Sequence, residues 1–308
     1  MLSEQSNRRA LTLTDLPKPP ENRTGWPWTK ASSPLAEYMP DGSAWPRISI
    51  ITPSYNQGQF LEETVRSVLL QGYPNLEYIV IDGGSTDNSV EILRKYQAHI
   101  TYWVSEKDKG QAHAINKGLK LSTGSILGWV NSDDLYAKSA LRKVAQALYK
   151  NQSCTMLHGN RILLNVKSEV TGFSHLPSFD PSTNQYIICS ETAFWRRTAM
   201  DQAGLLKESL QFAMDLEYFG RLYLQGKFLK LDDYLGYFRC YNLNKSSTIP
   251  HIRLKEASRE WKHLFGTELI SKPTRIGKLK SLKVLITHPY SIGFPYVSYK
   301  MSTIRQSS

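Results

Sequence analysis

Two adjacent aspartates, Asp133 and Asp134, are the residues of this sequence whose types and spacing best suit chemistry. They follow a short apolar run at 125–130, within the motif NSDD. Hard cations such as Mg²⁺ and Mn²⁺ take oxygen ligands and commonly bind one or two carboxylates together with substrate phosphates. Such a cation would neutralise the charge that develops on a leaving nucleotide. An Asp-Asp pair after a strand is also common in solvated turns, so the surrounding segments must decide between the two interpretations.

Three other polar segments also follow apolar runs of strand length. The segments are TPSYN (52–56), DGGSTD (82–87) and SEKDKGQ (105–111), and the runs are 48–52, 76–82 and 100–106. Helical patterns occupy 60–71, 87–96, 112–121 and 141–149. This alternation with short connections predicts a parallel sheet with right-handed crossovers. Because open α/β sheets bind ligands beyond the carboxyl ends of their strands, all four polar segments are expected at one binding edge.

Two of these segments carry side chains that suit a nucleotide. The carboxylate of Asp82 could accept two hydrogen bonds from the N–H or O–H groups of a base or ribose. Pro53 is rigid, and the ring of Tyr55 could stack on a base. Roles without a ligand are also open, because Ser85 and Asp87 suit the start of a helix and Tyr55 could pack in the core.

With these motifs in order, residues 48–96 and 109–136 resemble the nucleotide-sugar half of family 2 glycosyltransferases. The similarity covers 47–150 in detail and 151–247 more weakly. It implies an α/β fold of the GT-A type, with a mostly parallel central sheet flanked by helices and an acceptor-facing second half. It also implies transfer of a sugar from a nucleotide-sugar donor to an acceptor hydroxyl, typically with inversion and with Mg²⁺ or Mn²⁺ as cofactor.

The resemblance assigns roles to residues of this chain. Donor binding would involve Thr52, Pro53, Tyr55, Asp82, Gly110, Gln111, His113, Asn116, Asn131 and Ser132, and metal binding Asp133 and Asp134. An inverting displacement needs a carboxylate that deprotonates the acceptor hydroxyl on the face opposite the leaving group. The matching position is Asp215, at the start of a helical pattern within 210–224, and Glu217 is the second candidate. Asp215 would also suit a helix N-cap.

Three positions depart from the family's pattern. Gly83 stands where the second acidic residue of the family's DDGSTD motif is usual, and Asn131 replaces the first aspartate of its DSDD motif. Tyr241 stands where a histidine often approaches the metal. Metal binding would therefore rest mainly on Asp133. The alternative function is a catalytically degenerate, glycosyltransferase-like binding protein.

Other function classes fit the sequence less well. A sugar nucleotidyltransferase needs a glycine-rich phosphate loop with a basic residue after its first strand, and 52–59 has neither Arg nor Lys. A nicotinamide dehydrogenase needs a G-x-G-x-x-G motif at the same place. A nucleic-acid-binding module would have aromatic residues interleaved with its charges, so no nucleic acid partner is expected.

The chain divides into four regions by composition. These are an irregular Pro-rich arm (1–46), a nucleotide-sugar-binding half (47–150), an acceptor-binding half that carries the catalytic base (151–250), and a basic C-terminal helix and tail (251–308). The arm contains Trp26, Trp28 and Trp45, so we expect it to lie against the main domain. The second half predicts a hairpin from 156–164 and 168–173, and a final pair of short strands within 228–241.

The net charge of +11 is unevenly distributed. Arg239 and Lys245 could clamp a diphosphate or could be ordinary surface charges. No acidic residue follows Glu268, whereas seven basic residues do: Lys272, Arg275, Lys278, Lys280, Lys283, Lys300 and Arg305. Such a tail could contact acidic lipid headgroups or a phosphorylated carrier, or could remain solvated.

The cysteines and the apolar runs indicate where the protein works. Cys154, Cys189 and Cys240 are widely spaced, which argues against a disulfide framework or zinc site and fits a reducing cytoplasm. No run reaches the about 18–20 apolar residues that span a bilayer, and the first residues lack a signal-peptide core. We therefore expect a cytoplasmic enzyme, peripheral at the inner membrane surface through its basic tail, that acts on a carbohydrate or lipid-linked acceptor.

Overall fold

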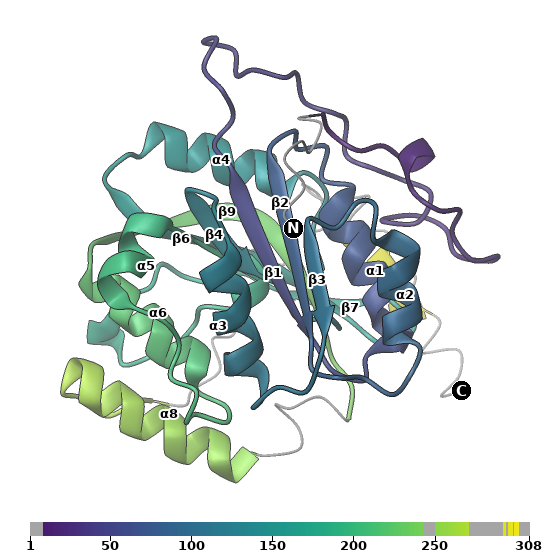
Figure 1. The fold of residues 1–308 in the computed structure, drawn as a ribbon. Coiled ribbons are helices and arrows are strands. Elements are labelled where there is room, and N and C mark those ends of the chain that lie inside the picture. The colour runs from purple at the N-terminus through teal and green to yellow at the C-terminus, as the bar shows by residue number, and fades with distance from the viewer. Residues whose placement is uncertain (1–8, 243–249, 271–291, 294, 298, 302–308) are drawn as a thin grey trace.

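The computed structural model describes residues 9–242, 250–270, 292–293, 295–297 and 299–301 (Figure 1). A nine-stranded sheet runs through both halves of the chain in the order β3-β2-β1-β4-β8-β6-β9-β5, with β7 beside β6. The strands are β1 (Ile48–Ser54), β2 (Leu76–Asp82), β3 (Tyr102–Ser105), β4 (Ile126–Trp129), β5 (Leu135–Tyr136), β6 (Cys154–Leu164), β7 (Val170–Ser174), β8 (Ala193–Arg196) and β9 (Lys227–Arg239). The helices are α1 (Gly58–Leu69), α2 (Ser89–Tyr96), α3 (Gln111–Leu121), α4 (Ala140–Lys150), α5 (Arg197–Ala203), α6 (Met214–Leu224) and α8 (Pro250–Phe265), with short 3-10 turns η1 (Leu13–Asp15), η2 (Pro181–Thr183) and η3 (Ser190–Thr192).

The first half of the sheet is parallel, as predicted. β1 lies between β2 and β4, and β3 lies outside β2. Ser54 at the end of β1 is level with Asp82 on β2, and Asp82 is level with Ser105 on β3. The four predicted strands and the helices between them are confirmed, with shifts at their ends. The carboxyl ends of these strands therefore form one edge.

The second half extends this sheet with antiparallel as well as parallel strands. β8 runs antiparallel to β4 and β6, and β6 forms the predicted hairpin with β7. The predicted pair of short strands is wrong, because β9 is one 13-residue strand that pairs in parallel with β6. The register between β9 and β6 shifts near Asn160, opposite the acidic residues Asp232 and Asp233. These polar residues interrupt the apolar pattern, so one strand has the pattern of two.

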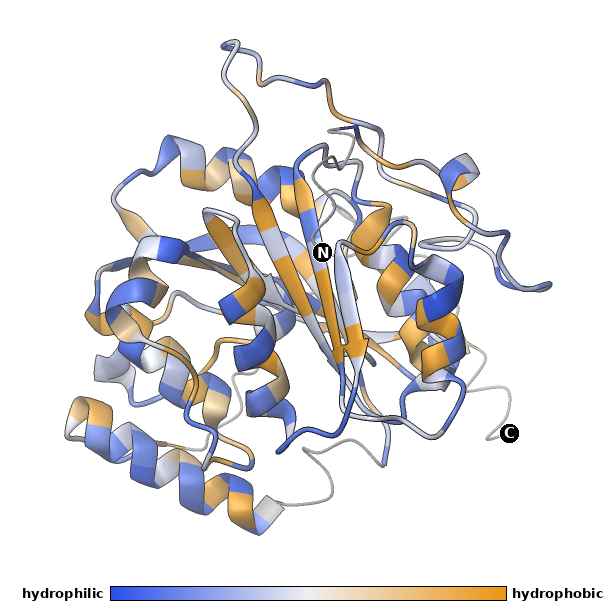
Figure 2. Ribbon diagram, viewed as in Figure 1, coloured by the Kyte–Doolittle hydropathy of each residue, from blue (hydrophilic) through white to orange (hydrophobic). Residues whose placement is uncertain are grey.

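Helices cover both faces of the sheet. Ile48 and Ile50 pack with α1, α2 and α4 on one face, whereas Ile51 packs with α3, α5 and α6 on the other. α8 lies against α6 on the second face, where its Trp261 is fully buried. Figure 2 shows apolar residues concentrated on the strands and polar residues on the outer helix surfaces. This burial of apolar surface fixes the strand ends that carry the polar segments.

The N-terminal arm lies against the α1 face, as expected. Trp28 and Trp45 are buried there. Arg66, fully buried on α1, donates hydrogen bonds to the carbonyl oxygens of Pro17, Pro27 and Trp28. A guanidinium has five donors and no acceptor. Arg66 therefore binds an irregular segment whose carbonyl groups have no sheet partner.

Candidate active site

A cavity of about 1660 Å³ opens at the carboxyl ends of β1, β2 and β4. All four polar segments contribute to its wall, which confirms that they converge on one edge. They supply Pro53, Ser54, Tyr55, Gly83, Lys107, Asp108, Gly110, Gln111 and residues 131–134, and Gln57 lies directly after the first of them. The second half supplies other parts of the wall, from β6, β7, residues 185–191 and the start of α6. Ligand pockets typically measure about 300–1,000 Å³, so this cavity has room for two substrates side by side.

Asp133 and Asp134 both line the cavity but have different surroundings. Asp134 is buried, and its Oδ1 accepts a hydrogen bond from the backbone N–H of Arg239 at 2.9 Å. Its Oδ2 accepts a longer bond from the Asn131 amide at 3.4 Å. Asp133 is half-buried, and its Oδ2 accepts a hydrogen bond from the Tyr241 hydroxyl at 2.9 Å. Asp134 is therefore fixed in the wall, and Asp133 is the more accessible carboxylate.

Negative charge collects at this pair. Burial raises the pKa of Asp133, and burial together with the charges of Asp133 and Glu191 raises the pKa of Asp134 well above its ordinary value. Such carboxylates favour a neighbouring cation, because it relieves the cost of keeping them charged. Asp133 is the carboxylate that could supply an oxygen ligand to a divalent cation, which commonly takes its other ligands from substrate phosphates and water. Within the described part of the chain, no three His, Cys, Asp or Glu side chains are placed to hold a metal on their own.

Tyr241, two residues beyond the end of β9, contacts the same carboxylate. Besides its bond to Asp133, the hydroxyl oxygen accepts a hydrogen bond from Gln57 at 3.3 Å, and the ring lies 5.3 Å from that of Phe60. Burial and the charge of Asp133 raise the pKa of Tyr241. The phenol therefore stays protonated at neutral pH and acts as a hydrogen-bond donor that orients Asp133.

Arg239 lies beneath the cavity rather than in it. Its side chain is fully buried and donates hydrogen bonds to the Asp133 carbonyl oxygen at 2.9 Å and to Glu63 Oε2 at 2.8 Å. Two further bonds reach the turn between β6 and β7. The suggestion that Arg239 clamps a diphosphate is therefore wrong. Instead it ties the aspartate segment to α1 and to the hairpin, and the other suggested clamp, Lys245, lies outside the described residues.

Asp215 lines the same cavity from the first turn of α6. Its Oδ1 accepts the N–H of Leu216 at 2.8 Å, and the helix N-cap is Ala213 rather than Asp215. Burial raises the pKa of Asp215 to about 6, although the Leu216 N–H and the Tyr186 hydroxyl both lower it. A base whose pKa lies near the working pH suits proton abstraction.

The motif order and this geometry agree with a family model. Residues 49–196 match the model described as glycosyl transferase family 2. This part of the chain belongs to glycosyl transferase family 2. The matched residues include the predicted metal segment and end with β8, so Asp215 lies beyond them.

Curated glycosyltransferases are related to this chain in sequence. TuaG, a putative teichuronic acid biosynthesis glycosyltransferase of Bacillus subtilis, is 32% identical over 151 residues, which cover 46% of this chain and 59% of TuaG. WfgD, the UDP-Glc:α-D-GlcNAc-diphosphoundecaprenol β-1,3-glucosyltransferase of Escherichia coli, is 33% identical over 127 residues, covering 41% of this chain and 50% of WfgD. The matches thus span 50–59% of the length of these two relatives.

Solved structures share the fold. Residues 1–349 of Staphylococcus aureus TarS in complex with UDP-GlcNAc superpose with a TM-score of 0.59 at 20% identity, covering 73% of this chain and 68% of that one. The mannosyltransferase PcManGT of Pyrobaculum calidifontis, in complex with GDP-Man and Mn²⁺, gives 0.56 at 16% identity, covering 91% and 83%. These likenesses confirm the α/β fold of the GT-A type.

Most of the predicted donor-binding residues reach the cavity. They are Pro53, Tyr55, Gly110, Gln111, Asn131 and Ser132. Tyr55 is 61% exposed, so it is not a core residue and its ring is available for stacking. Gln111 donates a hydrogen bond to Asn131 Oδ1 at 2.8 Å and so joins two of the polar segments.

Asp82 is placed differently from the expectation that it contacts a base or ribose. Its carboxylate is fully buried and is not part of the cavity wall. It accepts hydrogen bonds from the backbone N–H and hydroxyl of Ser85 and from the hydroxyl of Ser105, at 2.6–2.9 Å. In this structure Asp82 therefore joins β2 to β3 and shapes the loop, because a buried carboxylate is stable only when hydrogen-bonded.

Three further predicted donor-site residues do not line the cavity either. Thr52 faces the α1 side of β1, where its Oγ1 accepts a hydrogen bond from Tyr78. The amide of Asn116 exchanges hydrogen bonds with the backbone of Leu206. His113 Nδ1 lies 3.4 Å from the N–H of Lys109 and accepts a long hydrogen bond from it. The orientation of Thr52 follows from strand alternation, because successive side chains on β1 point to opposite faces of the sheet.

Asp108 is a cavity residue that the sequence analysis missed. A Cβ atom at Gly83 would lie 2.7 Å from Asp108 Oδ2, so a larger residue at 83 would collide with this carboxylate. Gly83 is the position where the family's motif usually has a second acidic residue. The structure therefore supplies an acidic group at nearly the same place from the next strand's loop.

The catalytic candidates on α6 separate into one cavity residue and one structural residue. Glu217 is fully buried, forms ion pairs with Arg221 at 2.8 Å and Lys207 at 3.0 Å, and does not line the cavity. The suggestion that Glu217 could be the catalytic base is therefore wrong. Glu256 on α8 accepts three hydrogen bonds from the backbone N–H groups of 211–213. This carboxylate satisfies N–H groups at the start of the helix that presents Asp215. No local pattern could reveal it, because Glu256 lies 43 residues after Ala213.

Proposed function

We propose that this glycosyltransferase moves a sugar from a nucleotide-sugar donor to an acceptor hydroxyl by metal-assisted direct displacement with inversion, in the synthesis of a polysaccharide, lipopolysaccharide or glycolipid. The observation that carries this proposal is that Asp133 and Asp215, from the two halves of the chain, line one cavity. One carboxylate suits a cation that faces a diphosphate, and the other, with its pKa of about 6, suits a general base.

In the proposed displacement, Asp215 accepts the proton of the acceptor hydroxyl while the acceptor oxygen bonds to the anomeric carbon, and the bond from that carbon to the nucleotide diphosphate breaks. Attack on the face opposite the leaving group inverts the configuration. Asp133 and Asp134 would hold Mg²⁺ or Mn²⁺, which when bound neutralises charge on the diphosphate. Pro53 and Tyr55 would frame the nucleotide base.

The second half of the chain supplies both polar and apolar residues to the cavity wall. The apolar ones include Leu176, Ile187, Phe212, Leu254, Leu269 and Ile270. Apolar and aromatic surfaces pack against the carbon faces of sugars and against lipid chains alike. The name of WfgD gives a diphosphoundecaprenol-linked sugar as its acceptor. We therefore propose a carbohydrate or lipid-linked acceptor for this chain.

Calorimetric titration tests the donor site. We expect one of UDP, GDP and dTDP to bind the purified protein in the presence of Mn²⁺, and Asp133→Ala to weaken that binding at least tenfold, because the cation loses its accessible carboxylate ligand. Exposed Asp201→Ala on α5 is the matched control and should bind as the wild type does. If no nucleotide binds with or without Mn²⁺, the catalytically degenerate alternative is favoured and the enzymatic proposal fails.

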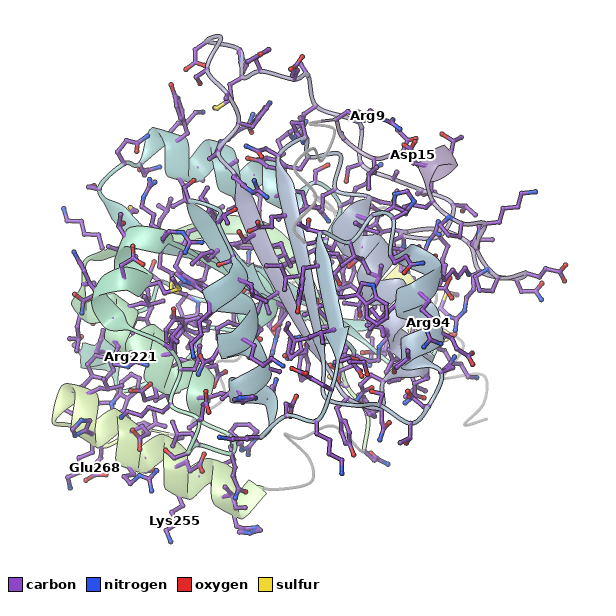
Figure 3. All side chains as sticks on the ribbon, in the orientation of Figure 1. Arg9, Asp15, Arg94, Arg221, Lys255 and Glu268 are labelled. Atoms are coloured by element: carbon purple, nitrogen blue, oxygen red, sulfur yellow. The ribbon has the colours of Figure 1, made fainter. Side chains whose placement is uncertain are left out.

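A second proposal concerns attachment to a membrane surface at the cytoplasmic side. In the described part of the chain, no helix is long and apolar enough to cross a bilayer. On α8, Lys255, Arg259 and Lys262 are exposed, whereas Glu256 and Glu260 are turned inward and buried. Figure 3 shows Lys255 pointing away from the sheet. This basic face supports contact with anionic lipid headgroups. Of the basic tail, all but Lys300 lies outside the described residues.

Vesicle sedimentation tests this contact. Lys255→Gln combined with Arg259→Gln should weaken binding to phosphatidylcholine vesicles containing phosphatidylglycerol about thirtyfold at low salt, since each basic residue near the surface contributes about 1 kcal/mol. Lys120→Gln combined with Lys150→Gln removes two exposed charges from α3 and α4 as the control. An equal loss in both double variants would show that only net charge matters, and no binding by the wild type would remove the proposal.

A further inference from the structure

Arg161 and Glu191 form an ion pair in the cavity wall that the mechanism above does not use. Arg161 lies on β6, and Glu191 lies in the 3-10 turn η3 that precedes β8. Arg161 Nη1 is 3.6 Å from Glu191 Oε1, and the guanidinium lies over the ring of Phe238 with its carbon 4.7 Å from the ring centre. Both residues line the cavity.

The pair has hydrogen-bonding capacity that the protein does not satisfy. The side chain of Glu191 is only 3% exposed, yet its Oε1 accepts no hydrogen bond from any described residue. Arg161 Nε likewise donates none within the described chain. Buried polar groups are nearly always hydrogen-bonded, and exceptions occur where a ligand or water completes the site. The geometry therefore points to a polar ligand at this part of the wall.

Glu191 lines the same cavity as Asp133 and Asp215. Its turn contacts β4, which leads to Asp133. The turn also packs against β9, where the Glu191 carbonyl oxygen leaves no room for a side chain at Gly236. The charge of Glu191 also acts on the carboxylates of both Asp134 and Asp215. In a direct displacement the transferred sugar must lie between the leaving diphosphate and the base. The sugar ring is therefore the part of the substrates that comes nearest to Glu191.

We propose that Glu191 and Arg161 bind hydroxyl groups of the transferred sugar and determine which sugar is used. This inference rests on the proposed function. A carboxylate accepts hydrogen bonds from hydroxyl groups, and a guanidinium donates to their oxygens, so the pair recognises two neighbouring hydroxyls at a fixed spacing. A sugar that lacks or inverts one of these hydroxyls leaves a buried charged group unpaired, which is the strongest basis for rejecting an analogue.

The test compares a nucleoside diphosphate with its sugar nucleotides in the Glu191→Gln variant. We expect the affinity for the diphosphate alone to change much less, because the proposed hydrogen bonds of Glu191 are to the sugar and its charge acts on Asp134 only through space. The affinity for the preferred sugar nucleotide should fall at least tenfold. The differences in affinity among the nucleotides of glucose, galactose and N-acetylglucosamine should become smaller. Glu91→Gln, an exposed residue of α2, is the isosteric control.

A second variant and a pH profile keep the inference open to refutation. Arg161→Lys keeps the charge but loses the planar fork, and should show the same selective loss. In Glu191→Gln the rise of kcat with pH should persist, since it belongs to Asp215. Loss of that rise would make Glu191 the base and overturn the proposal, as would equal weakening of the diphosphate and the sugar nucleotide. If the wild type binds no nucleotide, the proposed function fails and the inference falls with it.

Discussion

Replacing Asp215 with asparagine is expected to lower kcat by a factor of about 10²–10⁴, because the amide cannot accept the acceptor proton. Asparagine has the same shape and can still accept the Leu216 N–H that orients the side chain. Binding of nucleotide with Mn²⁺ should be unchanged, since that site lies on the other half of the cavity. The measurement is the initial rate of sugar transfer at saturating donor, with calorimetry on the same preparation.

The pH dependence should identify the same residue. With a pKa of about 6, the Asp215 carboxyl is protonated and inactive below that pH and becomes competent above it. The wild-type kcat should therefore rise through about pH 6 and level off. A profile with no rise between pH 5 and 7 would show that another group is the base.

Stability separates a loss of catalysis from a loss of structure. The folded-state pKa of Asp215 is raised from 3.8 to about 6, so folding favours the protonated form. The contribution of this carboxyl to stability is therefore greatest below about pH 4 and decreases as the pH rises to about 6. At pH 7.5 Asp215→Asn removes a buried charge and should melt at or above the wild-type temperature. A clear fall in Tm would mean that the variant loses activity through its fold.

Replacing Arg239 with methionine is expected to lower the free energy of unfolding by about 3–5 kcal/mol, because it leaves a buried carboxylate without its partner. The Arg239 side chain is fully buried and that of Glu63 is only 5% exposed. Arg239 Nη2 lies 2.8 Å from Glu63 Oε2. The guanidinium also stacks over Phe60 and bonds the Asp133 carbonyl oxygen. Urea unfolding monitored by tryptophan fluorescence measures the loss.

Two comparisons make this prediction specific. Arg94→Met replaces an arginine on the exposed side of α2 (Figure 3) and should change stability by less than about 0.5 kcal/mol. Adding Glu63→Leu to Arg239→Met should restore part of the loss, since it removes the unpaired charge. A cost below 1 kcal/mol for Arg239→Met would show that the buried network does not hold the aspartate segment.

The parallel half of the fold and the convergence of the polar segments could be predicted from local patterns. Strand length, helical spacing and the order of strands and helices are properties of neighbouring residues, and they place Asp133 and Tyr55 at one edge. Strand register is harder to predict, because it depends on partners far away in the sequence. β9 therefore has the pattern of two strands although it forms one, with the register shifts near Asn160.

Periodicity and motif order are local properties of the chain, and they were enough to predict the fold class, the family and the side of the sheet on which the site lies. The polar side chains that face the cavity could be identified only in the folded protein. Arg239 and Glu217 are charged residues near the predicted site motifs, but both form buried ion pairs. Asp108, within the predicted polar segment 105–111, and Glu191, which no motif indicated, both line the cavity. The physical reason is that a charged side chain acquires its role from the partners that folding brings to it, and those partners lie on distant elements.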